Sequence, residues 1–145
     1  MKSVPDFPID GWEFCTLTSE SGRERIEDWL KNRVSIGEVK GVRAYMMEIL
    51  RNLRMVKMEL WRRPQFQWFQ GAHEGIGEIR FNYKKVEYRM LGCLGPRADQ
   101  FTLLVGASKR SNSEWDPKNA RDSAVEWMKF LGNRPENINA IKIPD

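Results

Sequence analysis

Three short runs of apolar or alternating residues constrain the fold of this chain more than any other feature. They cover residues 79–83, 86–94 and 101–107, where aromatic and β-branched side chains are frequent. Lys84 and Lys85 join the first two runs, and residues 95–99 join the last two. Connections this short and polar predict hairpins, so we expect three neighbouring antiparallel strands.

The N-terminal half predicts one strand and two helices. Residues 12–18 (WEFCTLT) have the aromatic and β-branched character of a strand. Ser21 and Glu24 match a capping box, which predicts a helix over residues 21–32. Apolar residues at spacings of three and four then predict a longer helix over residues 37–60.

End signals bracket a final helix. Asp116 is a favourable N-cap, Pro117 suits the first helical position, and Gly132 suits the position just past the end. Residues 1–11 and 133–145 each contain two prolines, so we expect irregular tails there.

This order of elements predicts an α+β fold. A strand and two helices precede an antiparallel sheet of about three further strands and a C-terminal helix, with the helices packed on one face. At 145 residues the chain can bury a core as a single domain, residues 1–145, without disulfides. Cys15 and Cys93 lie in apolar runs and are expected to be buried thiols, too few for a metal site.

Composition is typical of a soluble globular protein. Hydrophobic residues make up 41% of the chain and charged residues 30%. No apolar run approaches the roughly 20 residues that span a bilayer. Residues 1–12 carry prolines and acidic residues where a signal peptide needs an apolar segment. We therefore expect a cytoplasmic protein with no membrane partner.

The net charge of +4 is concentrated in one segment. Residues 38–63 carry a positive excess equal to that of the whole chain. A localised basic surface suits a polyanion or an acidic protein partner. A solvated helix face explains the segment equally well.

Each of the three predicted strands carries an arginine within it or just beyond its end. These are Arg80, Arg89 and Arg110. Arginine keeps its charge at any pH and presents a planar fork to phosphate, so three of them on neighbouring strands predict an anion-binding concavity. The competing interpretation is a salt bridge, for instance to Glu78 or Glu87.

The strand motifs, taken in order, resemble a known family of toxins. Residues 78–80 (EIR), 88–91 (YRML), 101–110 (FTLLVGASKR) and 119–121 (NAR) are similar to motifs of the RelE/HigB superfamily from toxin–antitoxin modules. The resemblance points to the phage-derived HigB-like branch. Residues 75–131 carry it, and the N-terminal half agrees only in its strand–helix–helix order.

The resemblance implies a ribosome-dependent mRNA endoribonuclease that uses no metal and no cofactor. Such an enzyme deprotonates the ribose 2′-OH, stabilises the phosphorane and protonates the leaving 5′-oxygen. Its partners would be the ribosome, mRNA and a small antitoxin protein that neutralises it. The alternative is a non-catalytic phage or prophage protein of the same fold that acts by binding another protein.

The family pattern also implies roles for individual cations. Arg89 and Arg110 would contact the scissile phosphate, and Arg80 would add a third contact. A further set would bind the RNA backbone: Lys84, Lys85 and Lys109. For each of these residues, a surface cation or a salt bridge is the competing interpretation. It is the favoured one for Lys84 and Lys85, whereas the phosphate role is favoured for Arg89 and Arg110.

The proton-transfer groups are less evident. Several active family members place a Tyr, a His or an acid near the start of the last helix. This chain has Trp115 there, which can stack on a base but cannot transfer a proton. Asp116 and the sole histidine, His73, are the candidates for proton transfer. An N-cap role for Asp116 and a solvated His73 are the simpler interpretations.

Arg62 and Arg63 lie beside a dense group of aromatic residues: Trp61, Phe66, Trp68 and Phe69. Interleaved aromatics and cations can hold single-stranded RNA, so the two arginines are further candidates for RNA binding. The same aromatics would instead close the core if they lie where the long helix meets the sheet. They would also suit the docking of a partner's helix or strand.

Overall fold

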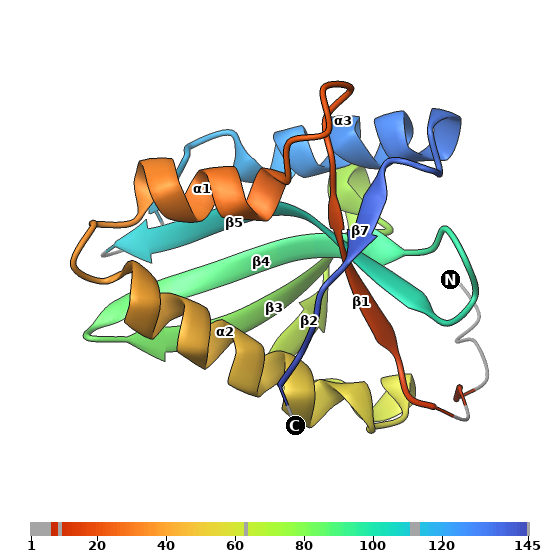
Figure 1. Cartoon of the computed structure of the whole chain (residues 1–145), viewed down its shortest axis with the longest axis horizontal. Coiled ribbons are helices and arrows are strands. Elements are labelled where there is room, and N and C mark those ends of the chain that lie inside the picture. Colours follow the sequence, from red (N-terminus) through yellow and green to blue (C-terminus); the bar gives the residue numbers. More distant parts are fainter. Residues whose placement is uncertain (1–6, 9, 63, 111–113, 145) are drawn as a thin grey trace.

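One β-sheet runs through the molecule, with helices on both of its faces (Figure 1). The computed structural model describes residues 7–8, 10–62, 64–110 and 114–144. The helices are α1 (Arg25–Arg33), α2 (Val39–Arg54) and α3 (Ala120–Asn133), with short 3₁₀ turns η1 (Met58–Leu60) and η2 (Gly71–His73). The strands are β1 (Glu13–Leu17), β2 (Phe66–Trp68), β3 (Gly77–Tyr83), β4 (Val86–Leu94), β5 (Gln100–Arg110), β6 (Glu114–Asp116) and β7 (Ile138–Ala140).

The sheet formed by the described residues is mixed and has seven strands. Its order is β2-β3-β4-β5-β1-β7, with β6 also paired to β5. Strands β2 to β5 pair antiparallel in succession, whereas β1 runs parallel to β5 and antiparallel to β7. β5 is long enough to pair with β1 through residues 100–103 and with β6 through residues 108–110.

The predicted layout has a strand and two helices followed by an antiparallel sheet of about three further strands, with the helices on one face. It is wrong, because the sheet is mixed and wider and the helices cover both of its faces. The three predicted hairpin strands do pair antiparallel, but β2, β6 and β7 widen the sheet and β1 makes it mixed. Each added strand has three residues, too few for alternation to be visible. The parallel pairing of Glu13 with Gln100 joins distant segments, which no local pattern reports.

The β3–β4 hairpin sets the register of the central sheet. Its loop consists of Lys84 and Lys85 alone, and both have positive φ (47° and 68°). Two positive φ values in a two-residue loop belong to a type I′ turn, whose twist matches that of the flanking strands. The resulting register places Arg80 directly opposite Arg89.

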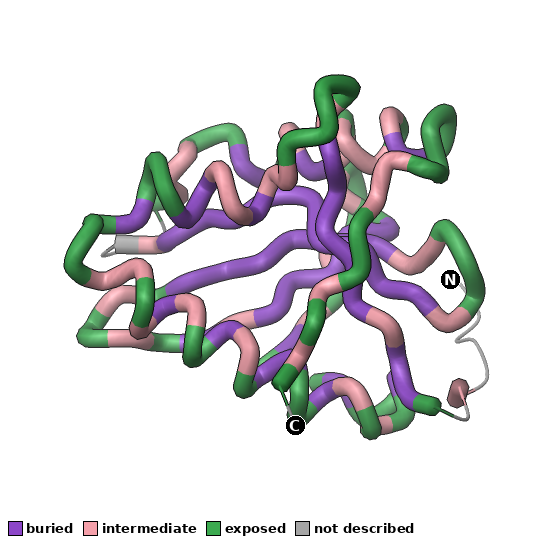
Figure 2. Tube along the Cα trace, viewed as in Figure 1, coloured by how far each residue is buried: buried purple, intermediate pink, exposed green. Residues whose placement is uncertain are grey.

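Two apolar cores lie on opposite faces of the sheet. Helices α1 and α2 cover one face, where they pack on side chains such as Ile79, Tyr88 and Phe101. Helix α3 packs on the other, over Leu91 and Val105. We call these the α1–α2 face and the α3 face. Figure 2 shows the central strands buried along most of their length, with exposure concentrated at turns and outer helix surfaces.

Two helices begin or end at residues other than those predicted. α1 begins at Arg25 instead of residue 21, because Gly22 takes a positive φ (85°) in a turn before it. α2 ends at Arg54, whose carbonyl accepts a hydrogen bond from the Trp12 N–H (2.9 Å). A continuing helix needs that carbonyl for residue 58, so docking of the N-terminal strand ends the helix. None of the described helices is long and apolar enough to cross a bilayer.

The C-terminal elements also differ from expectation. Asp116 is not an N-cap: it ends β6, its carboxylate lies 3.6 Å from Arg33, and α3 begins only at Ala120. Gly132 lies inside the last turn of α3 instead of past its end. β7 forms within the expected irregular tail and pairs with β1, a contact that depends on the assembled sheet.

Both cysteines are buried, as predicted. Burial and the nearby Glu13 carboxylate raise the pKa of Cys15 to about 12. The Cys15 thiol therefore stays protonated at neutral pH, which makes it a poor nucleophile.

Packing of α1 on β5 can be tested at Gly106, where an added Cβ would overlap the ring of Trp29. We expect Gly106→Ala to lower the free energy of unfolding by about 1–3 kcal/mol, the usual cost of overpacking. Gly132→Ala is the matched control. Nothing lies within 4 Å of its added Cβ, so the helix preference of Ala should raise stability by about 0.5–1 kcal/mol. Urea denaturation measures both effects, and equal effects would contradict this packing.

Candidate functional site

The α3 face carries a group of charged side chains beyond the part on which α3 packs. Strand pairing places Arg80 opposite Arg89, and Glu87 opposite Lys109, with Glu78 two residues before Arg80. Directly paired residues, and residues two apart in one strand, point to the same side of a sheet. All five side chains therefore share the α3 face, and we call them the charged strip.

Glu78 and Arg89 form a buried ion pair within the strip, with exposed fractions of 1% and 4%. Oε1 of Glu78 accepts a hydrogen bond from Nε of Arg80 (2.5 Å) and lies 3.6 Å from Nε of Arg89. Arg89 donates from Nη2 to Glu87 (2.8 Å) and from Nη1 to the carbonyl of Tyr88 (3.2 Å). Its buried Nε has no hydrogen-bond partner among the described residues.

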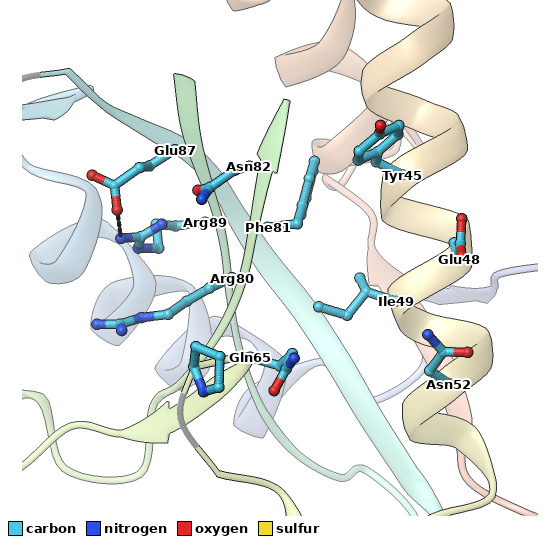
Figure 3. A pocket seen from close by; sticks show the side chains of 11 residues that line it. Tyr45, Glu48, Ile49, Asn52, Gln65, Arg80, Phe81, Asn82, Glu87 and Arg89 are labelled. Carbon is cyan, nitrogen blue, oxygen red and sulfur yellow. Dashed lines mark hydrogen bonds and ion pairs between the residues drawn. The ribbon is translucent and has the colours of Figure 1, made fainter. Parts of the chain in front are cut away.

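The sequence allows two interpretations of the strand arginines, anion binding and a salt bridge, and these contacts show which one applies to Arg89. At Arg89 the structure shows the salt bridges to Glu78 and Glu87, and a buried guanidinium held by two carboxylates has little freedom to meet a ligand. Arg80 differs, because only its Nε bonds to a described residue and its side chain is 24% exposed. The two outer nitrogens of Arg80 are therefore able to meet an anion (Figure 3).

Trp115 of β6 lies beside the charged strip with two cations over its ring. Nζ of Lys109 is 5.0 Å from the ring centroid, and the guanidinium carbon of Arg121 is 5.5 Å from it. Lys109 is the direct partner of Trp115 in the β5–β6 pair, and Arg121 comes from the first turn of α3. The ring of Phe69 lies 6.3 Å from that of Trp115. We call these four side chains the Trp115 cluster.

His73 of η2 adjoins this cluster and is bonded to a carboxylate. Its Nε2 lies 2.8 Å from Oδ1 of Asp122 on α3, and its ring lies 6.2 Å from that of Phe69. A carboxylate can only accept, so Nε2 carries the proton and Nδ1 of the neutral ring is an acceptor. No described residue bonds to Nδ1. The contact joins a largely buried histidine side chain to an exposed carboxylate, with exposed fractions of 19% and 82%.

The structure brings five of the predicted site residues to one region. His73 contacts the ring of Phe69, which in turn contacts the ring of Trp115. The other four share the α3 face: Arg80, Arg89, Lys109 and Trp115. Arg110 ends β5, but its side chain lies outside the described residues, as does Arg63.

The other predicted residues lie elsewhere. Lys84 and Lys85 form the hairpin turn, and Nζ of Lys84 lies 3.4 Å from the carboxylate of Glu38, just before α2. Asp116 is engaged with Arg33 at the end of β6. Arg62 is exposed just before β2, beside aromatics that belong mostly to the core.

Arg121 and Asp122 are parts of the site that sequence reasoning missed, and the sequence places Phe69 only in the aromatic group beside Arg62 and Arg63. Phe69 directly follows β2. Side chains alternate between the two faces along a strand, so the sequence spacing of three residues predicts that Phe69 and Phe66 lie on opposite faces. Phe66 is buried in the core of the α1–α2 face, whereas Phe69 packs on the α3 face. No local signal links Asp122 to His73, which lies 49 residues away.

Among the described residues, no group of three or more His, Cys, Asp or Glu side chains is placed to hold a metal ion. No protein-family model and no curated protein matches the sequence. The geometry of the charged strip and of the Trp115 cluster is therefore the observation that bears on function.

Removing Arg89 leaves the buried Glu78 with Arg80 as its ionic partner. We expect Arg89→Met to lower the free energy of unfolding by about 3–5 kcal/mol, because a buried carboxylate loses a compensating charge. Arg80→Met is the matched control and should cost less, since Arg80 is partly exposed. In urea denaturation, adding Glu78→Leu to Arg89→Met should recover part of the loss. Equal costs for the two arginine variants would show that Glu78 does not depend on Arg89.

The hydrogen bond from Arg89 lowers the pKa of Glu87. Because the folded-state pKa is depressed, the contribution of Glu87 to stability is present above its unfolded pKa of about 4.3 and is lost as pH falls through the folded value. Between pH 7 and pH 3, the free energy of unfolding should therefore fall less steeply in Glu87→Gln than in wild type. Glu126→Gln, on an exposed surface of α3, should leave the slope unchanged. Parallel curves for wild type and Glu87→Gln would contradict this linkage.

Proposed function

We propose that the α3 face binds single-stranded RNA and that the protein is the toxin of a toxin–antitoxin module, a ribosome-dependent mRNA endoribonuclease that uses no metal. The observation that carries the proposal is the Trp115 cluster. There an aromatic ring and two cations, Lys109 and Arg121, lie together on the face that also carries Arg80. The resemblance of the strand motifs to RelE/HigB toxins supports the same assignment.

RNA is bound in this proposal by base stacking on an aromatic ring and by ionic contacts to phosphates. A base stacked on Trp115 contributes about 1–3 kcal/mol whatever its identity. Lys109 and Arg121 lie beside the same ring and meet the phosphates that flank this base. Arg80 offers its outer nitrogens to a further phosphate. Glu78 and Arg89 are positioning residues in this scheme, because they hold Arg80 without facing the RNA.

Cleavage needs a group that accepts the proton of the ribose 2′-OH. His73 supplies it through Nδ1, because Nε2–H is held by Asp122. The carboxylate then stabilises the imidazolium that forms. Arg80 and Lys109 stabilise the negative charge that develops on the phosphorane. The bond from phosphorus to the 5′-oxygen then breaks, and the departing 5′-oxygen takes up a proton from water.

The proposal places the protein in the cytoplasm with the ribosome and mRNA as partners. Its third partner is a small antitoxin protein. The cations of the Trp115 cluster are what an antitoxin must cover to neutralise RNA binding, so acidic side chains suit its contact surface.

A second candidate function is non-catalytic binding of another protein. The observation that favours it is the engagement of Arg89 by Glu78 and Glu87. The Nε of Arg89 that lacks a hydrogen-bond partner is buried, whereas Arg80 has outer nitrogens that are unbonded to described residues on a partly exposed side chain.

RNA binding and cleavage are separated by two variants, Trp115→Ala and His73→Ala. In fluorescence anisotropy with a labelled single-stranded RNA, Trp115→Ala should raise Kd by about 5- to 150-fold, the equivalent of one lost stacking contact. His73→Ala should bind as wild type does. On induced expression in bacteria, wild type should arrest growth and cleave mRNA, and both variants should relieve the arrest.

Matched controls lie away from the Trp115 cluster. Trp68→Ala removes an exposed tryptophan on the α1–α2 face, and Lys129→Ala removes a lysine on the outer surface of α3. Neither should change RNA binding. Binding without arrest or cleavage by wild type would favour the non-catalytic function. Absence of both binding and arrest would exclude the RNA proposal, and cleavage by His73→Ala would exclude His73 as the base.

A further inference from the structure

The outer edge of β3 is only partly occupied. β2 pairs with residues 77–79, and the carbonyl of Gln65 accepts a hydrogen bond from the N–H of Arg80 (2.8 Å). From there to the hairpin turn, no strand of the described chain pairs with that side of β3. Unpaired edges are where a sheet accepts a strand from another molecule.

Strand geometry identifies the backbone groups that face outwards. The N–H of Arg80 points away from β4, because it bonds to Gln65. Backbone direction alternates along a strand, so the C=O of Arg80 and both the N–H and the C=O of Asn82 point the same way. Phe81 and Tyr83 direct their groups towards β4 instead. Asn82 is exposed, so its outward groups are accessible.

A groove of about 520 Å³ straddles this edge. Four residues of α2 line it on the α1–α2 side: Tyr45, Glu48, Ile49 and Asn52. Arg80, Asn82 and Glu87 line it on the α3 side. Figure 3 shows α2 across the groove from the arginines, with β3 between them. Tyr45 is half-exposed, at 49% for the whole residue, which leaves an aromatic surface available at this wall.

We propose that this edge binds an extended segment of a partner protein in which apolar and acidic residues alternate. A strand added beside residues 81–83 directs successive side chains to opposite faces of the sheet. On the α1–α2 side they meet Tyr45 and Ile49, which favours apolar residues. On the α3 side they meet the outer nitrogens of Arg80, which favours carboxylates.

A second copy of this chain fits the edge poorly. β2 already pairs with residues 77–79 of β3. The β3 strands of two copies can therefore pair antiparallel only if the pairing is centred on Asn82. That register sets Arg80 of each copy against Lys84 of the other, and like charges opposite each other destabilise a sheet. The docking site depends on backbone groups of β3, on α2 and on Arg80. Arg80 is the one residue that it shares with the proposed RNA-binding function, and the site otherwise goes beyond that function.

The probe is the peptide VDVEVD, acetylated and amidated at its ends, titrated into ¹⁵N-labelled full-length protein and followed by amide chemical shifts. Shifts should centre on residues 80–83, and the lysine peptide VKVKVK should bind at least tenfold more weakly. Asn82→Pro removes the outward N–H without touching the β3–β4 ladder and should weaken VDVEVD binding at least tenfold. Asn82→Ala keeps that N–H and should bind as wild type does.

Other outcomes overturn the proposal. Equal affinity for both peptides, or wild-type affinity in Asn82→Pro, would exclude strand addition at this edge. Self-association by sedimentation that Asn82→Pro abolishes would assign the edge to a second copy. If Asn82→Pro fails to fold, Arg80→Glu tests the proposal instead. This variant should bind VKVKVK more tightly than VDVEVD, the reverse of wild type, and an unchanged preference for VDVEVD would exclude the role of Arg80. RNA anisotropy should be unchanged in Asn82→Pro, so failure here is distinguishable from failure of the RNA proposal.

Discussion

The carboxylate of Glu78 is the constraint on which the α3 face depends. A buried anion is tolerated only when cations and hydrogen-bond donors surround it, and Arg80 and Arg89 supply them here. Both reach it only in the register in which they are opposite each other on β3 and β4. A slip by one residue would turn these charges into the apolar α1–α2 core. The ion pairs therefore favour the same register as the two-residue turn.

The two faces of the sheet carry different kinds of side chain. The α1–α2 face is filled by apolar and aromatic side chains, whereas the α3 face is divided between a core under α3 and the charged strip. Lys109, Trp115 and Arg80 stand on paired strands, which hold side chains more rigidly than loops do. His73 is the exception, because it lies in a short 3₁₀ turn and is held by Asp122.

Features with a local signal were predictable from the sequence, and features that depend on distant contacts were not. Alternation and a two-residue loop predict the β3–β4 hairpin, and the same loop explains why Arg80 and Arg89 are opposite each other. The end of α2 at Arg54 depends on a hydrogen bond from Trp12. Asp116 has every local property of an N-cap, yet pairing with β5 draws it into a strand. The His73–Asp122 contact likewise joins segments with no shared motif.

The position of β1 in the sheet has a consequence for synthesis of the chain. β1 is translated first among the described strands, and its parallel partner β5 comes much later: Gln100 lies 87 residues after Glu13. At a translation rate of about 5–20 residues per second, the nascent β1 waits on the order of ten seconds before that partner exists. During that interval Phe14 and Leu17, both buried in the finished fold, have no sheet to cover them. The β3–β4 hairpin can form meanwhile from local contacts, whereas β1 cannot pair in the sheet until β5 has been synthesised.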